Sequence, residues 1–284
     1  MYSQEITRRH RTAFAIAIDQ SGSMQERVRF GRHEMSKAAA VARITNSLLT
    51  ELVDRSTRTD GVRNYYDVAV VGYSGDEVRM LLDEDGFVAV DRLARRRPQT
   101  ETLYSEETLP DGSAMLAGHS MHQWFLPQAA GKTPMYEALL RVRDLLAAWC
   151  ARNENRASFP PVVINITDGE ASDCTDDELR RVCSQIRRLS TDDGAALLFN
   201  IHISTDSSSP AMVFPMPDEI ARANPYARLL AECSSIMPEP FDEAVREFKG
   251  AGAMPPFYGM GYNTSIIELL SIINIGSRSI TSIE

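Results

Sequence analysis

The chain has 284 residues, 43% of them apolar, and 30 Lys and Arg against 39 Asp and Glu give it a net charge of −9. This length and apolar content support a substantial core, and we expect one domain, residues 1–284, that carries insertions. An acidic chain is a poor match for nucleic acid or an anionic membrane surface, so neither is an expected partner.

The cysteines and the N-terminal sequence indicate in which cellular compartment the protein is expected. The chain has four cysteines and no C-x-x-C pair, which indicates neither a zinc pattern nor a disulfide framework and favours a reducing compartment. The apolar run that ends at Asp19 is too short for the core of a signal peptide, and no stretch approaches the length of a membrane span. We therefore expect a soluble, cytoplasmic protein.

The first predicted element is a buried strand over residues 14–19, which ends in the carboxylate of Asp19. A tight turn with two hydroxyls follows it, Asp19-Gln20-Ser21-Gly22-Ser23-Met24. The carboxyl ends of parallel strands are where such folds place their ligand sites. Carboxylate and hydroxyl oxygens there suit a hard divalent cation such as Mg²⁺.

The next elements alternate between helix and strand. Apolar spacing predicts a helix over residues 34–53, a strand over 66–73 and, across a turn, an antiparallel strand over 77–82. From residue 83 to 130 the periodicity fades, and because this stretch is too long for an ordinary connection we predict an insertion that borders the site.

The second half repeats the alternation. A helix is expected from Pro134 to about Ala151, then a strand over 162–167 that leads to Asp168, then a helix opened by a capping box of Thr175 and Glu178. The remaining elements are a strand within 195–204, a second insertion at about 205–255 with helices near 218–233 and 241–248, a short strand near 257–259 and a last helix from about residue 264. Such alternation predicts an α/β, doubly wound, mostly parallel sheet with one antiparallel edge strand and helices on both faces.

Three loops carry matching oxygens. Asp19, Ser21 and Ser23 form D-x-S-x-S, Thr133 stands in Gly131-Lys132-Thr133-Pro134, and Asp168 ends the strand over 162–167. In order and in strand–loop context, these positions resemble the metal-ion-dependent adhesion site (MIDAS) of von Willebrand factor A (VWA) domains. The resemblance covers most of the chain, from about residue 14 onward.

The resemblance implies a VWA fold and a role for each of the five residues. Ser21 and Ser23 would bind Mg²⁺ directly, with Mn²⁺ or Ca²⁺ as alternatives, and Asp19 and Asp168 would act through water and hydrogen bonds. Thr133 would join when a ligand is bound. Because such a site leaves the cation electrophilic, a Glu or Asp carboxylate of a protein partner can complete the metal shell.

The function expected from the resemblance is metal-dependent protein–protein interaction, as an adaptor or regulator without catalytic residues. The chain is similar to the intracellular, stand-alone bacterial VWA proteins of tellurium-resistance and stress systems. Nucleotide binding is not expected, because the phosphate-loop pattern needs a glycine where Leu126 stands.

Other interpretations stay open. Taken singly, Ser21-Gly22-Ser23 is an ordinary turn, Thr133-Pro134 an ordinary helix start and Asp168-Gly169 an ordinary loop. A metal-assisted hydrolase would need a general base, and the histidines are scattered along the sequence, at His10, His33, His119, His122 and His202. A VWA subunit of an ATPase or metal-chelatase machine is the other alternative.

Overall fold

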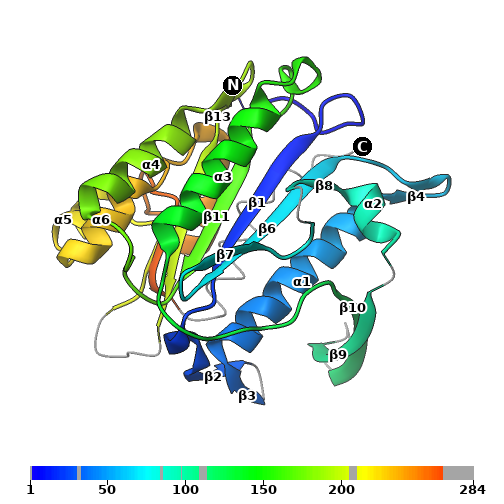
Figure 1. Cartoon of the computed structure of the whole chain (residues 1–284), viewed down its shortest axis with the longest axis horizontal. Coiled ribbons are helices and arrows are strands. Elements are labelled where there is room, and N and C mark those ends of the chain that lie inside the picture. Colours follow the sequence, from blue (N-terminus) through cyan, green and yellow to red (C-terminus); the bar gives the residue numbers. More distant parts are fainter. Residues whose placement is uncertain are drawn as a thin grey trace.

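A computed structural model describes residues 2–30, 33–83, 86–96, 98–108, 114–204 and 210–264. Within these residues an eight-stranded sheet is covered by helices on both faces (Figure 1). Its strand order is β15-β16-β14-β11-β1-β6-β7, and β8 also pairs with β6. The α/β fold class predicted from the sequence is confirmed.

The centre of the sheet is parallel. The parallel strands are β1 (Thr12–Asp19), β6 (Tyr66–Ser74), β11 (Val162–Thr167), β14 (Leu197–Ile203) and β16 (Met260–Thr264). The predicted antiparallel edge strand is β7 (Glu77–Met80), and β8 (Val88–Ala89) also runs antiparallel to β6. A further antiparallel strand, β15 (Met212–Val213), forms the opposite edge and is too short to leave a pattern in the sequence.

β1 is buried along its whole length, which explains its unbroken apolar sequence. Phe14, Ile16 and Ile18 pack into the core on the α1 side, whereas the alternate positions are alanines that pack on the α3 side. Small side chains there let α3 lie close to the sheet.

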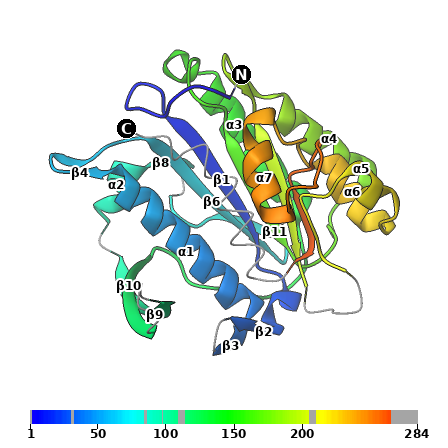
Figure 2. The ribbon, with the colours of Figure 1, turned by 180° about the vertical axis from the view of Figure 1, so that it is seen from behind.

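Helices cover the two faces as predicted. Helices α3 (Met135–Cys150), α4 (Asp176–Arg188) and α6 (Pro225–Cys233) contribute to one core, and α1 (Lys37–Ser56) and α7 (Asp242–Lys249) to the other (Figures 1 and 2). The predicted capping box of α4 is present, with Thr175 and Glu178 bonded to each other's backbone. Short helices complete the set, α2 (Val90–Ala94), α5 (Pro217–Ala221), η1 (Gly22–Gln25), η2 (Asn153–Asn155) and η3 (Glu239–Phe241).

The first helix begins and ends three residues later than predicted. The residues before it form a hairpin of β2 (Arg27–Phe30) and β3 (His33–Ser36). Ser36 then caps α1, because its hydroxyl accepts a hydrogen bond from the Ala39 backbone N–H at 3.1 Å. Smaller hairpins are β4 (Thr57–Arg58) with β5 (Gly61–Val62) and β12 (Ser190–Thr191) with β13 (Gly194–Ala195).

The predicted insertion at 83–130 contains a long hairpin, β9 (Gln99–Thr108) with β10 (Ala114–Gln123), which the sequence does not reveal because it lacks an alternating apolar pattern. It lies beside α1 and outside the central sheet (Figure 1). Asn46 of α1 fixes its base, since it donates to the Phe125 carbonyl at 3.1 Å and accepts from the Trp124 N–H at 3.0 Å.

The last predicted elements differ most from the structure. The short strand expected near 257–259 begins instead at Met260, while Tyr258 forms a single bridge with Ile236. The helix expected from about residue 264 lies outside the described residues, apart from Thr264, which ends β16. Among the described helices, none is both long and apolar enough to span a bilayer.

Candidate functional site

Backbone hydrogen bonds bring the predicted loops together at the carboxyl end of the sheet. The Gly22 N–H donates to the Gly131 carbonyl at 2.9 Å, and the Ala130 N–H donates to the Gln20 carbonyl at 2.8 Å. Gly131 has φ 74°, and a Cβ there would stand 2.6 Å from the Cα of Gly75. Only glycine at position 131 allows its loop to approach the turn at Gly75 this closely.

Asp19 is fully buried at the end of β1, and both of its carboxylate oxygens accept hydrogen bonds. Its Oδ1 accepts from the Ser21 backbone N–H at 2.8 Å, and its Oδ2 accepts from the Thr167 hydroxyl at 2.9 Å. The first bond closes the turn of D-x-S-x-S, and the second connects β1 to the end of β11.

A chain of oxygens continues from the turn to Asp168. The hydroxyls of Ser21 and Ser23 are 3.1 Å apart, and the Ser23 hydroxyl donates to Asp168 Oδ1 at 2.6 Å. Four of the five predicted residues, Asp19, Ser21, Ser23 and Asp168, are therefore linked by hydrogen bonds.

Thr133 is placed beside this group by its loop. It is 8% exposed, and within the described chain its hydrogen bonds run through its backbone. Its N–H donates to the Ser172 hydroxyl at 3.0 Å, and its carbonyl accepts from the Ser172 N–H at 3.0 Å. The Thr133 hydroxyl is thus left out of the chain of oxygens that joins the other four.

The site carries more negative than positive charge in its buried part. Burial raises the pKa of Asp19 above its ordinary value, and the nearby Asp168 carboxylate raises it further, while hydrogen bonds from Ser21 and Thr167 oppose the shift. Within the described residues no three or more His, Cys, Asp or Glu side chains gather as a metal-binding group. A cation here would depend on two carboxylates and neutral hydroxyls, and this all-oxygen donor set fits Mg²⁺, Mn²⁺ or Ca²⁺.

Lys37 is a member of the site that we did not predict. Its ammonium lies 3.2 Å from Asp168 Oδ2 and also pairs with Glu26, although the residue is only 4% exposed. A signal for it exists in the sequence, because Lys37, Val41, Ile44 and Leu48 continue one buried stripe of α1 at helical spacing.

A polar ladder behind the site was also missed. The Tyr73 hydroxyl donates to Asn165 Oδ1 at 3.0 Å, and the Asn165 amide donates to Asn200 Oδ1 at 3.1 Å. Asn165 and Asn200 are register partners on β11 and β14. Each is the single amide of a strand made mainly of apolar residues, and that pattern is the sequence signal for a buried polar network.

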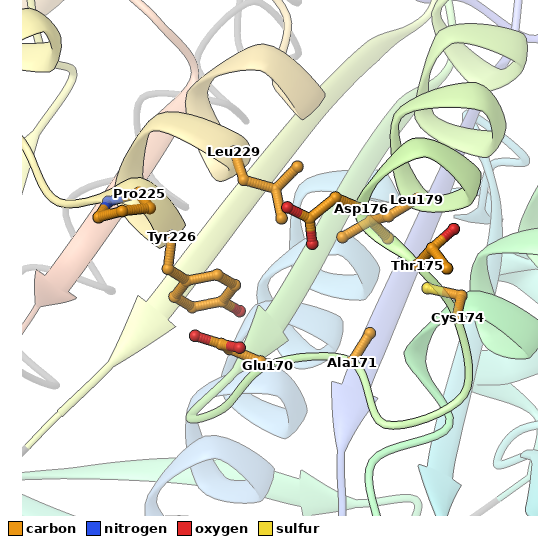
Figure 3. Close-up of a pocket in the computed structure, with 9 residues that line it drawn as sticks. All are labelled: Glu170, Ala171, Cys174, Thr175, Asp176, Leu179, Pro225, Tyr226 and Leu229. Atoms are coloured by element: carbon orange, nitrogen blue, oxygen red, sulfur yellow. The ribbon is translucent and has the colours of Figure 1, made fainter.

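A pocket of about 150 Å³ lies between helices α4 and α6 and residues 170–175 of the loop that follows Asp168 (Figure 3). The Tyr226 hydroxyl donates to the Gly169 carbonyl at 2.6 Å, which ties α6 to this loop. Figure 3 shows the Glu170 carboxylate close to the Tyr226 ring, and Asp176 across from them beside Leu229. The pocket thus has apolar walls and two carboxylates.

His202 is held by its neighbours. Its ring stacks on Tyr262 with centroids 4.8 Å apart, and its Nδ1 accepts from the Asn263 N–H at 3.2 Å. It also hydrogen-bonds to the Asp168 backbone, and burial lowers its pKa. These contacts give the imidazole a packing role beside the site.

Comparisons with known proteins returned distant structural likenesses. The chain is similar to a von Willebrand factor type A protein from Catenulispora acidiphila, with 16% identity and a TM-score of 0.41 over 69% of this chain. It spans 34% of the length of that protein. It is also similar to the vWF domain of the type V pili tip protein Mfa5 from Porphyromonas gingivalis, with 11% identity, a TM-score of 0.46 and 97% coverage of both chains.

No protein-family model matches the chain, and no curated protein matches it. At these identities and TM-scores, the functions of the two structural neighbours do not carry over to this protein.

Proposed function

We propose that this protein is a VWA-like module that binds a protein partner through a divalent cation. Asp19, Ser21, Ser23, Thr133 and Asp168 would hold the cation, with Mg²⁺ favoured and Mn²⁺ or Ca²⁺ as alternatives. The observation that carries the proposal is the hydrogen-bonded set of oxygens, which runs from Asp19 through Ser21 and Ser23 to Asp168 at the ends of two adjacent strands.

The residues of this hydrogen-bonded set have separate parts in the proposed function. The buried Asp19 fixes the turn that carries Ser21, and Asp168 orients the Ser23 hydroxyl. When bound, the cation would supply a positive centre able to accept an anionic group. Because serine hydroxyls are neutral, they leave much of that charge uncompensated, which favours a Glu or Asp carboxylate as the partner's contact.

The surroundings support recognition of a protein chain. The pocket between the 170–175 loop and helices α4 and α6 has apolar walls from Leu179 and Leu229, which could contact residues that flank the partner's acid. We propose an adaptor or regulator, without an enzymatic reaction of its own, and the stand-alone bacterial VWA proteins of stress systems as its relatives by resemblance. The contacts of His202 support this, since they leave the imidazole poorly placed to act as a general base.

The test is a titration with Mn²⁺, which electron paramagnetic resonance detects directly, together with thermal unfolding in Mg²⁺. We expect the wild-type protein to bind Mn²⁺ and to gain thermal stability by mass action. The Ser21→Ala, Ser23→Ala double variant should lose both responses. Ser190→Ala, which removes an exposed hydroxyl far along the chain in β12, should keep them. A double variant that binds Mn²⁺ as the wild type does would place the metal elsewhere.

A further inference from the structure

Lys37 places a buried positive charge against the proposed metal ligands. Its side chain is 5% exposed, and that of Asp168 is 0% exposed. The ammonium lies 3.2 Å from Asp168 Oδ2 and pairs on its other side with Glu26, whose side chain is 50% exposed. A lysine is rarely buried unless it is paired, so these carboxylates account for its place.

The two oxygens of Asp168 are divided between two neighbours. Oδ1 accepts from the Ser23 hydroxyl at 2.6 Å, and Oδ2 accepts from Lys37 Nζ at 3.2 Å. The carboxylate therefore lies between the hydroxyls that would hold the cation and an ammonium that belongs to the protein.

The position of Lys37 works against the preference of its own helix. It is the first residue of the 20-residue helix α1, and a positive charge at a helix N-terminus is unfavourable. The Lys37 N–H donates to the Glu26 carbonyl at 2.8 Å, so the backbone also fixes the helix start near the site. The Lys37 ammonium is thus fixed at a position where the helix dipole disfavours a positive charge and where little solvent can stabilise it.

We propose that Lys37 sets the charge of the metal centre, so that the centre binds its cation more weakly and an anionic ligand more strongly. This inference rests on the proposed function. At the site, the described charged groups with buried side chains are Asp19, Asp168 and Lys37, and their charges sum to −1 − 1 + 1 = −1. A divalent cation brings this sum to +1, whereas without Lys37 the sum would be zero. Glu26 is half exposed, so solvent and salt weaken its compensation of Lys37 without removing it, and it is left out of this sum.

The first test compares Lys37→Met with Lys132→Met by Mn²⁺ titration. Both variants remove one positive charge from the neighbourhood of the site, but Lys132 is exposed in the loop before Thr133. We expect Lys37→Met to bind Mn²⁺ about tenfold or more tightly than wild type and Lys132→Met within about threefold. If Lys37 only holds Asp168 in place, Lys37→Met binds Mn²⁺ more weakly, and that result overturns the inference.

A second variant keeps the test decisive if Lys37→Met fails to fold. Glu26→Gln leaves Lys37 in place and removes a half-exposed carboxylate that compensates it. We expect Glu26→Gln to bind Mn²⁺ more weakly than the wild type. Binding as tight as wild type, or tighter, would contradict the proposal.

The anionic ligand is tested with acetate on the Mn²⁺-loaded protein, with water proton relaxation as the readout. Acetate that displaces metal-bound water lowers the relaxation enhancement, and we expect the wild type to respond at lower acetate concentration than Lys37→Met. An equal response would overturn this part. If the wild type binds no Mn²⁺ at all, the proposed function fails; if it binds Mn²⁺ and Lys37→Met binds no tighter, only this inference fails.

Discussion

The Thr167 hydroxyl donates to Asp19 Oδ2 at 2.9 Å, and these two residues end the adjacent strands β11 and β1. Asp19 is fully buried, so bulk solvent cannot readily replace a lost donor to its carboxylate. The same hydroxyl lies 2.8 Å from the Gly169 carbonyl, which competes for its single proton, and it accepts a hydrogen bond from the Gly169 N–H at 3.1 Å. One hydroxyl thus connects the buried carboxylate of one loop to the backbone of the other.

Replacing Thr167 by Val should therefore cost about 1–3 kcal/mol of unfolding free energy, because it leaves a buried carboxylate short of one donor. It should also weaken Mn²⁺ binding, since Asp19 and the 168–169 loop are no longer tied together. Urea unfolding and Mn²⁺ titration measure the two effects.

Thr12→Val is the matched control for this change. Thr12 is buried at the opposite end of β1, where its hydroxyl donates to the Pro160 carbonyl at 3.1 Å. The control should lose stability and keep its Mn²⁺ affinity. Equal losses of Mn²⁺ affinity in both variants would show that Thr167 acts through general stability alone.

Much of the fold could be predicted because the central strands β1, β6 and β11 are buried and unbroken. β11 was predicted at its observed bounds, since a strand of four apolar residues with Asn165 and Thr167 leads directly into Asp168. The hairpin of β9 and β10 could not be predicted, because β9 is mostly polar and neither strand alternates apolar with polar residues. The first helix was misplaced by three residues because its cap, Ser36, is preceded by residues that also fit a helix.

The part of the site that lies within one short turn could be predicted from the sequence. Asp19, Ser21 and Ser23 lie within one turn, so their proximity follows from their spacing. Lys37 and Thr167 were missed for different reasons: a lysine at a helix start resembles a solvated charge, and a threonine at a strand end resembles a β-branched core residue. Only the packing of α1 and β11 around Asp19 and Asp168 shows their contacts.

Tyr226→Phe should loosen the loop that follows Asp168. The Tyr226 hydroxyl bonds to the Gly169 carbonyl at 2.6 Å, and its removal leaves the ring and its packing in place. We expect a loss of about 1 kcal/mol in stability, and Mn²⁺ affinity lowered a few-fold.

Tyr262→Phe is the control for Tyr226→Phe, because the Tyr262 hydroxyl accepts from the Asn224 amide at 2.8 Å and not from the loop. This control should bind Mn²⁺ as the wild type does. If Mn²⁺ affinity falls in Tyr262→Phe but not in Tyr226→Phe, the Tyr226 hydroxyl does not stabilise the metal-site loop.

The hairpin of β9 and β10 should be removable beyond its base. Thr102 and Ser120 are register partners, so residues 103–119 can be replaced by Asn-Gly while the part that contacts Asn46 and Thr50 remains. We expect this variant to keep its Mn²⁺ affinity and most of its unfolding free energy. Loss of Mn²⁺ binding on this deletion would show that the outer hairpin shapes the metal site itself.

The cysteine thiols should react slowly in the folded protein. Burial raises the pKa of Cys150 to about 11, and burial together with nearby acidic residues raises that of Cys174 to about 12. A raised thiol pKa lowers the thiolate fraction near neutral pH, so both should react with a disulfide reagent about a hundredfold or more slowly than free cysteine at pH 7.5. Reaction rates in buffer and in concentrated urea test this, and a fast-reacting thiol in buffer would contradict it.

Thr133→Ala should separate the resting metal site from the ligand-bound one. The Thr133 hydrogen bonds within the described chain run through its backbone, and alanine can keep them. Since Asp19, Ser21, Ser23 and Asp168 are joined without the Thr133 hydroxyl, we expect Mn²⁺ affinity to stay within about threefold of wild type. Acetate binding to the Mn²⁺-loaded protein should weaken by about 1–3 kcal/mol, the usual size of a coupling energy, if Thr133 moves to the metal when a carboxylate arrives.

Ser23→Ala is the comparison for Thr133→Ala, because the Ser23 hydroxyl contacts both Ser21 and Asp168 and its loss should lower Mn²⁺ affinity directly. Parallel Mn²⁺ and acetate titrations decide between the two roles: if Thr133→Ala loses Mn²⁺ affinity as Ser23→Ala does, Thr133 is an ordinary resting ligand and its hydroxyl does not act in a switch.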